Sequence, residues 1–126
     1  MTADRPVCLL RYADELTWAD VEAVHDYLMD GVRPLAYDGP SGNAQRTALG
    51  FATALTHLAA ALHHDLLYRQ SAGPAVEAER LRRVRATWNS VWHLAAPWRG
   101  AEGYDARRWL QLTYLTRHDE KEHTAR

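Results

Sequence analysis

Residues 44–70, AQRTALGFATALTHLAAALHHDLLYRQ, decide the fold. The segment is rich in alanine and leucine, which rank among the strongest helix formers. Its main apolar stripe recurs at the three- and four-residue spacing of one helix face: Phe51, Leu55, Leu58, Leu62 and Leu66. At about 1.5 Å per residue this helix spans about 40 Å, so we predict that it is the central helix of a bundle.

A shorter helix is predicted before it, over residues 17–30. Thr17 is a good N-cap, and Asp20 stands three positions later, as in a capping box. Gly31 follows the last apolar repeat, and Pro34 disfavours a continuing helix. We therefore expect this helix to end at Gly31, before the turn-rich segment 37–43.

Two further helices are predicted after the central one. Pro74 suits the first turn of a third helix running to about Ala96. Its apolar positions share one face: Leu81, Val84, Trp88, Val91 and Ala95. After a loop over 97–104, a fourth helix is expected over 105–118. Its inward face would hold Trp109, Leu112 and Thr116.

The chain as a whole is predicted to be an all-α, single-domain helical bundle of about four helices over residues 1–126. Residues 1–16 are expected to form an extended N-terminal arm, in which Val7–Tyr12 is the only candidate strand. The charged tail over 119–126 is expected to fray.

Composition excludes several classes of protein. The 126 residues are 47% hydrophobic and 25% charged, as in ordinary globular domains. Fifteen Lys and Arg balance sixteen Asp and Glu, which makes a nucleic-acid binder unlikely on charge grounds. Glu77 and Glu79 dilute the one basic patch, which we interpret as a solvated face: Arg80, Arg82, Arg83 and Arg85.

Localisation follows from similar arguments. Cys8 is the single cysteine, so no internal disulfide is possible. No stretch has the length and hydrophobicity of a signal peptide or a membrane span. We expect a cytoplasmic protein that does not contact a membrane.

The central helix carries a second stripe opposite the first: Arg46, Gly50, Thr53, His57, Ala60, His64 and Tyr68. Three interpretations remain open. The stripe is a solvated face, or a helix contact in a homodimer, since small residues permit close approach. Alternatively it lines a ligand groove in which histidines titrate near neutral pH.

The groove interpretation supplies candidate site residues. His64 and His57 would transfer protons, while Arg46, Tyr68 and Trp98 would bind the ligand. No metal or cofactor is expected, because His57 and His64 are about 10 Å apart along the helix. The run LAAALHHDLL resembles the His-Asp segment of HD-domain phosphohydrolases, in which His64 and Asp65 would be the metal dyad, but the sequence does not place the further His and Asp of that family.

In size and helical character the whole chain is similar to the lysinoalanine-forming proteins of duramycin- and cinnamycin-type lanthipeptide clusters. The resemblance implies a homodimer that binds a modified peptide and adds a lysine amine to a dehydroalanine. We therefore expect a cofactor-free tailoring or accessory protein that binds a peptide or small molecule along helix 44–70. The alternative is a non-catalytic interaction or regulatory protein acting as a homodimer.

Overall fold

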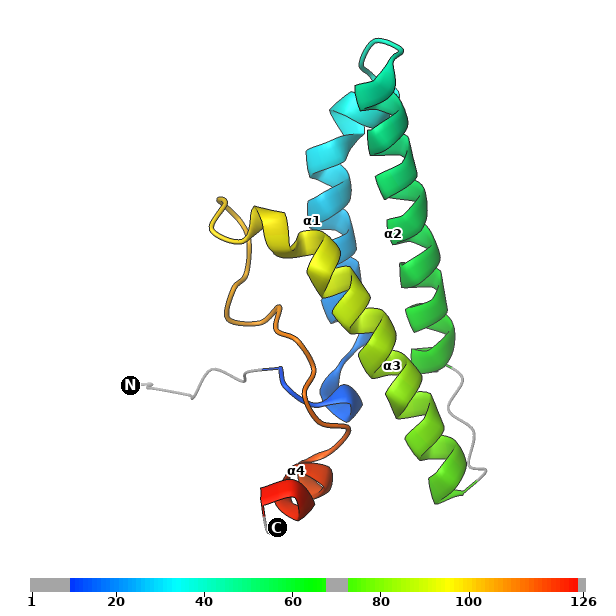
Figure 1. Ribbon diagram of the computed structural model, residues 1–126, viewed down its shortest axis with the longest axis vertical. Coiled ribbons are helices and arrows are strands. Elements are labelled where there is room, and N and C mark those ends of the chain that lie inside the picture. The colour runs from blue at the N-terminus through cyan, green and yellow to red at the C-terminus, as the bar shows by residue number, and fades with distance from the viewer. Residues whose placement is uncertain (1–9, 68–72, 125–126) are drawn as a thin grey trace.

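The computed structural model describes residues 10–67 and 73–124 and has an all-α fold (Figure 1). Four α-helices and two short 3-10 helices follow one another within these ranges. Their bounds are η1 Ala13–Glu15, α1 Trp18–Tyr37, α2 Asn43–Leu67, α3 Pro74–Ala95, η2 Ala96–Trp98 and α4 Arg117–Thr124.

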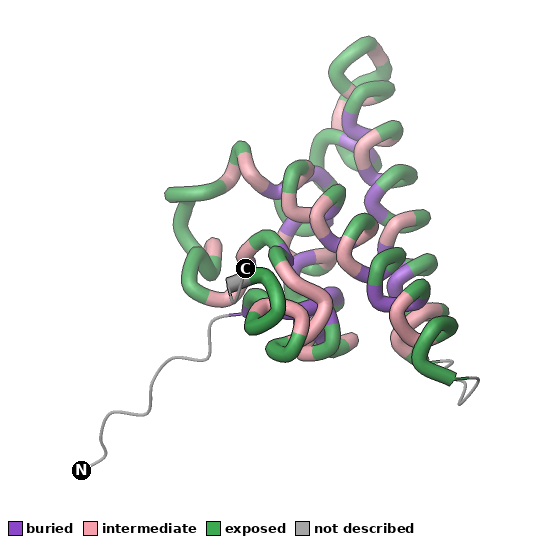
Figure 2. Tube along the Cα trace, turned by 60° about the horizontal axis from the view of Figure 1, so that its bottom comes forward, coloured by how far each residue is buried: buried purple, intermediate pink, exposed green. Residues whose placement is uncertain are grey.

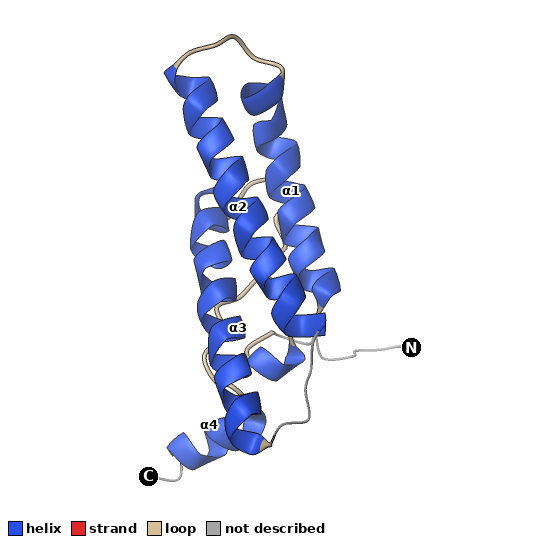
Figure 3. Ribbon diagram, turned by 90° about the vertical axis from the view of Figure 1, so that its right-hand side faces the viewer, coloured by secondary structure: helices blue, strands red, loops and turns tan. Residues whose placement is uncertain are grey.

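Helices α1 and α2 form an antiparallel hairpin, and α3 packs against it. The looped end of the hairpin extends beyond α3 (Figures 1 and 3). Buried and exposed positions alternate along the helices, so each presents one face to a shared core (Figure 2). The largest fully buried side chains belong to that core: Trp88, Leu10, Leu28, Leu55, Leu62, Val21, Val24, Val84 and Val91.

The predictions for α2 and α3 are confirmed within the described residues. On α2, Leu55 and Leu62 are fully buried, and the rest of the stripe packs partly buried against the core. On α3 the whole predicted apolar face is buried. The Thr17–Asp20 capping box is also present, since each residue's side chain bonds the other's backbone N–H.

The prediction that the first helix ends at Gly31 is wrong. Helix α1 continues to Tyr37, through both Gly31 and Pro34. Val32 and Ala36 are buried beyond the expected end, so packing in the hairpin outweighs the low helix propensity of glycine and proline. Pro34 still accepts the backbone hydrogen bond of Asp38, which closes the last turn.

The predicted helix over 105–118 is also absent. Trp109 and Leu112 are buried as expected, but they lie in a non-helical segment that runs along α3. Polar side chains of α3 form hydrogen bonds with the backbone of this segment and take the place of the bonds that a helix would make. Trp88 Nε1 donates to Leu110 O (2.7 Å), Trp92 Nε1 to Trp109 O (2.9 Å), and Asn89 bonds both the N–H and the C=O of Leu112 (2.8 and 3.1 Å).

A helix replaces most of the expected frayed tail. Thr116 Oγ1 accepts a hydrogen bond from Asp119 N (3.1 Å) and so caps the start of α4. Glu120 on this helix accepts a hydrogen bond from Tyr12, and Arg117 pairs with Glu15 (3.2 Å). The C-terminal segment is thereby fastened to η1.

The expected N-terminal arm is packed where the structure describes it. Leu10, Tyr12, Ala13 and Leu16 are all buried, and Tyr12 forms an isolated parallel bridge with Tyr114. Half of the candidate strand Val7–Tyr12, residues 7–9, lies outside the described residues.

The basic patch on α3 is only partly a solvated face. Arg82 and Arg83 are exposed, but Arg80 is 4% exposed. Its guanidinium bonds the Glu77 carboxylate (2.6 and 2.8 Å) and the backbone carbonyl of Asp65 (2.8 Å). Arg80 therefore ties the last turn of α2 to α3.

Candidate functional site

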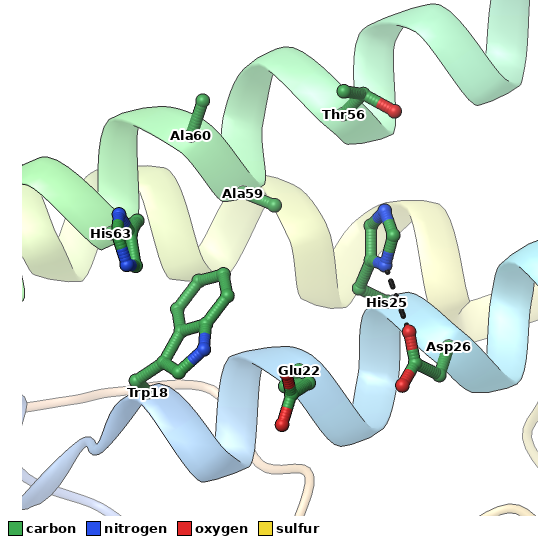
Figure 4. A pocket seen from close by; sticks show the side chains of 8 residues that line it. All are labelled: Trp18, Glu22, His25, Asp26, Thr56, Ala59, Ala60 and His63. Atoms are coloured by element: carbon green, nitrogen blue, oxygen red, sulfur yellow. Dashed lines mark hydrogen bonds and ion pairs between the residues drawn. The ribbon is translucent and has the colours of Figure 1, made fainter.

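A groove of about 360 Å³ lies between α1 and α2 (Figure 4). Helix α1 contributes the aromatic and charged side chains, and α2 contributes mainly small ones. The lining residues are Trp18, Glu22, His25 and Asp26 from α1, and Thr56, Ala59, Ala60 and His63 from α2.

The local sequence explains why space remains between the two helices. Thr56, Ala59 and Ala60 are too small to fill the gap that their helix leaves beside α1. The capping box of Thr17 fixes the start of α1 and with it the position of Trp18 in the first turn. The groove thus lies between large side chains on α1 and mainly small side chains on α2.

His25 and Asp26 form a hydrogen-bonded pair at one end of the groove. His25 Nδ1 lies 3.2 Å from Asp26 Oδ1, and the imidazole is the less exposed partner. The second ring nitrogen of His25 is turned towards α2 (Figure 4). When Asp26 accepts the Nδ1 proton, that second nitrogen is left as a proton acceptor facing the groove.

An aromatic contact closes the other end. The rings of Trp18 and His63 meet edge to face, with centroids 4.5 Å apart and planes at 68°. Trp18 is half-buried and also packs on the hydrophobic core, so its ring is held on one side. The indole forms a rigid apolar wall beside the histidine.

The charge of the lining is one-sided. Glu22 and Asp26 are acidic, and none of the eight lining residues is lysine or arginine. The groove therefore combines an aromatic wall, two carboxylates and two histidines. Such a set can bind a ligand and move a proton.

The structure places the predicted histidines elsewhere. His57 and His64 are exposed on the outward face of α2 and do not line the groove. Arg46 is exposed near the start of α2, where Nη2 bonds Asn43 Oδ1 (2.6 Å). The roles assigned to these residues stay predictions. Tyr68 lies outside the described residues.

Trp98 has a packing role. It lies in η2, half-buried, with its ring centroid 5.6 Å from that of Phe51. It packs on the core, and its Nε1 would lie 3.4 Å from a Cβ at Gly31. Trp98 therefore joins the end of α3 to the hairpin and does not line the groove.

Sequence reasoning missed Trp18, His25 and His63. The signal was present as two short polar stripes beside the core stripes. Trp18, Glu22 and His25 recur at helical spacing on α1, and Thr56, Ala60 and His63 do so on α2. The two stripes form a single site only when α1 and α2 pack together.

The described residues offer little support for a metal centre. Nowhere in 10–67 or 73–124 do three or more His, Cys, Asp or Glu gather closely enough to hold an ion. Within the same ranges, every helix is too short or too polar to cross a membrane.

Comparisons of the chain with protein-family models, with curated proteins and with solved structures found no match. The functional argument therefore rests on the groove itself.

Proposed function

We propose that this protein binds a peptide or small molecule in the α1/α2 groove and acts on it, or presents it, without a cofactor. The observation that carries the proposal is the His25–Asp26 pair at 3.2 Å, set in a groove that Trp18 walls. A histidine oriented by a carboxylate is a common general base, and an adjacent aromatic wall supplies binding surface.

The chemistry that suits such a site is proton-coupled addition. In lysinoalanine formation, the reaction implied by the resemblance in size and helical character, a lysine amine nitrogen bonds to the β-carbon of a dehydroalanine. The π electrons move to the α-carbon, which gains a proton while the nitrogen loses one. His25 would accept the nitrogen's proton and return one to the α-carbon, so no oxidant or metal is needed.

Fragment screening by proton–nitrogen correlation NMR tests the groove. Bound fragments should shift the indole N–H of Trp18 and the backbone amides of Ala59, Ala60 and His63, while α3 amides stay unchanged. Shifts confined to His57, His64 and Arg46 would move the site to the outer face of α2. No shifts from any fragment would remove the groove as a binding site.

A second function is favoured by the outer face of α2. Residues 47–64 contain no Asp, Glu, Lys or Arg, although ten of the eighteen are exposed, three of them in the groove lining and seven outside it. Helix α1, by contrast, exposes Glu22, Asp26, Asp30 and Arg33. An uncharged face with an open glycine at Gly50 suits close packing against another helix. We propose, as the alternative, a non-catalytic homodimer that pairs through this face.

Sedimentation equilibrium at micromolar concentration tests the dimer. The wild type should have twice the monomer mass, and Ala54→Glu should reduce it to the monomer. Ala86→Glu, an exposed alanine on α3, is the matched control and should remain dimeric. A monomeric wild type, or equal masses for all three proteins, would overturn this alternative.

A further inference from the structure

We infer that the α1/α2 groove is selective for a small organic cation, such as a trimethylammonium group on a short apolar body. The inference rests on the binding part of the proposed function, because it names the class of ligand that the same groove takes; a trimethylammonium ligand has no N–H and would be bound without the proton transfer. Three features support it: the aromatic wall, the sign of the charges and the size of the space.

The aromatic wall is the first feature. Trp18 lines the groove between His63 and Glu22 (Figure 4). Tryptophan is the best of the aromatic residues at attracting a cation over its ring face. Packing on the core and the His63 contact restrict the indole, so little freedom is lost when a ligand binds.

The charges are the second feature. Glu22 and Asp26 stand one helical turn apart on α1, with their side chains at the same groove. The titratable groups of the lining are these two carboxylates with His25 and His63, and no lysine or arginine lines the groove. The side chains of fixed charge in the lining are thus both negative. A cation is therefore attracted and an anion repelled.

The size of the space is the third feature. A volume of about 360 Å³ holds a small ligand. A quaternary ammonium group keeps its charge at every pH and has no N–H to donate. Selectivity for it thus depends on charge and the ring face, and hydrogen bonding to the charged centre contributes nothing.

The test is a titration of the full chain at about pH 8 and low salt, where the attraction of the two carboxylates for a cation is little screened. Three probes of nearly equal shape are compared: choline, its uncharged isostere with a tert-butyl group in place of trimethylammonium, and the tert-butylacetate anion. Binding is followed at the Trp18 indole N–H. Choline should bind roughly three- to tenfold more tightly than the isostere, and the anion more weakly still.

Two variants locate the selectivity. Glu22→Gln keeps the shape of an exposed side chain and removes one charge, so the preference for choline should fall at least twofold. Asp30→Asn is the matched control, because Asp30 is exposed on α1 but does not line the groove. It should leave the preference unchanged.

The outcomes separate the two proposals. Equal binding of all three probes would overturn cation selectivity and leave the groove a binding site. The inference would also be overturned if Glu22→Gln did not lower the preference for choline, or if Asp30→Asn lowered it equally. Either result would mean that the preference comes from the general charge of α1. No shift of Trp18 with any probe would also overturn the inference, and the fragment screen would then decide the proposed function.

Discussion

At the scale of single residues, the adjacent histidines of α2 separate the groove from the outer face. His63 lines the groove and touches Trp18, whereas His64 is exposed outside the lining. His63→Ala should weaken choline binding severalfold, while His64→Ala should not. Both should change stability by about half a kcal/mol or less, as exposed positions usually do. The titration above and thermal melts measure the two effects, and a loss confined to His64→Ala would favour the outer stripe.

The Asp20–Arg108 ion pair is a second residue-scale feature. Asp20 is 6% exposed, caps α1 and accepts Arg108 Nε at 2.7 Å. Arg108→Ala leaves this carboxylate buried without its cation and should lower the free energy of unfolding by about 1–3 kcal/mol. The arginine is partly exposed, which keeps the loss below that of a fully buried pair. Arg107→Ala, at an exposed neighbour, should cost little in denaturant melts. Equal losses would contradict the role of the pair.

Tyr12 gives a prediction at alkaline pH. Its hydrogen bond to the Glu120 carboxylate, with burial, raises the pKa of the phenol above its ordinary value. The resulting stabilisation is complete below the pKa of unfolded tyrosine and is lost as pH rises through the folded pKa. Glu120→Gln should therefore lower the pKa of Tyr12 in a tyrosinate absorbance titration, with Tyr12→Phe to identify the signal. Tyr104, whose pKa burial raises, is the internal control and should not move.

At the scale of elements, α1 is a helix that tolerates a glycine in its middle. A Cβ at Gly31 would meet Trp98 Nε1 at 3.4 Å, an ordinary contact distance. Gly31→Ala should therefore raise the free energy of unfolding by about 0.5–1 kcal/mol through helix propensity. Gly31→Leu should lower it, because the longer side chain needs the space that Trp98 fills. Denaturant melts of both variants test this, and a loss for Gly31→Ala would mean that the helix needs glycine there.

The elements also show how far sequence patterns reach. Helices α2 and α3 were predictable because alanine-rich runs and one apolar face act within a single segment. The conformation of segment 105–118 was not predictable. Trp109 and Leu112 have helical spacing, but side chains of α3 take the backbone hydrogen bonds that a helix would need. The groove escaped prediction for the same reason: its two halves meet only when α1 and α2 pair.

At the scale of the whole molecule, segment 109–116 and α4 support the core unequally. Ending the chain after Thr116 removes α4, with its contacts to Tyr12 and Glu15, and should lower stability while the fold persists. Ending it after Arg108 also removes buried Trp109 and Leu112 and uncovers Trp88, a loss of several kcal/mol that should unfold the chain. Circular dichroism melts of the two shortened chains measure the difference. Unfolding of the first chain would show that α4 is required for the fold.

The bridge between Tyr12 and Tyr114 determines the order in which parts of the chain can pack during synthesis. Ala13 N donates to Tyr114 O (2.9 Å), and Tyr12 bonds Glu120, 108 residues further along. Closing so long a loop costs more conformational entropy than closing the short turn between α1 and α2. The helical hairpin is therefore free to assemble while the chain is still being synthesised. The segment around Leu10 and Tyr12 is made early, yet it can take its place only when residues 113–120 have left the ribosome.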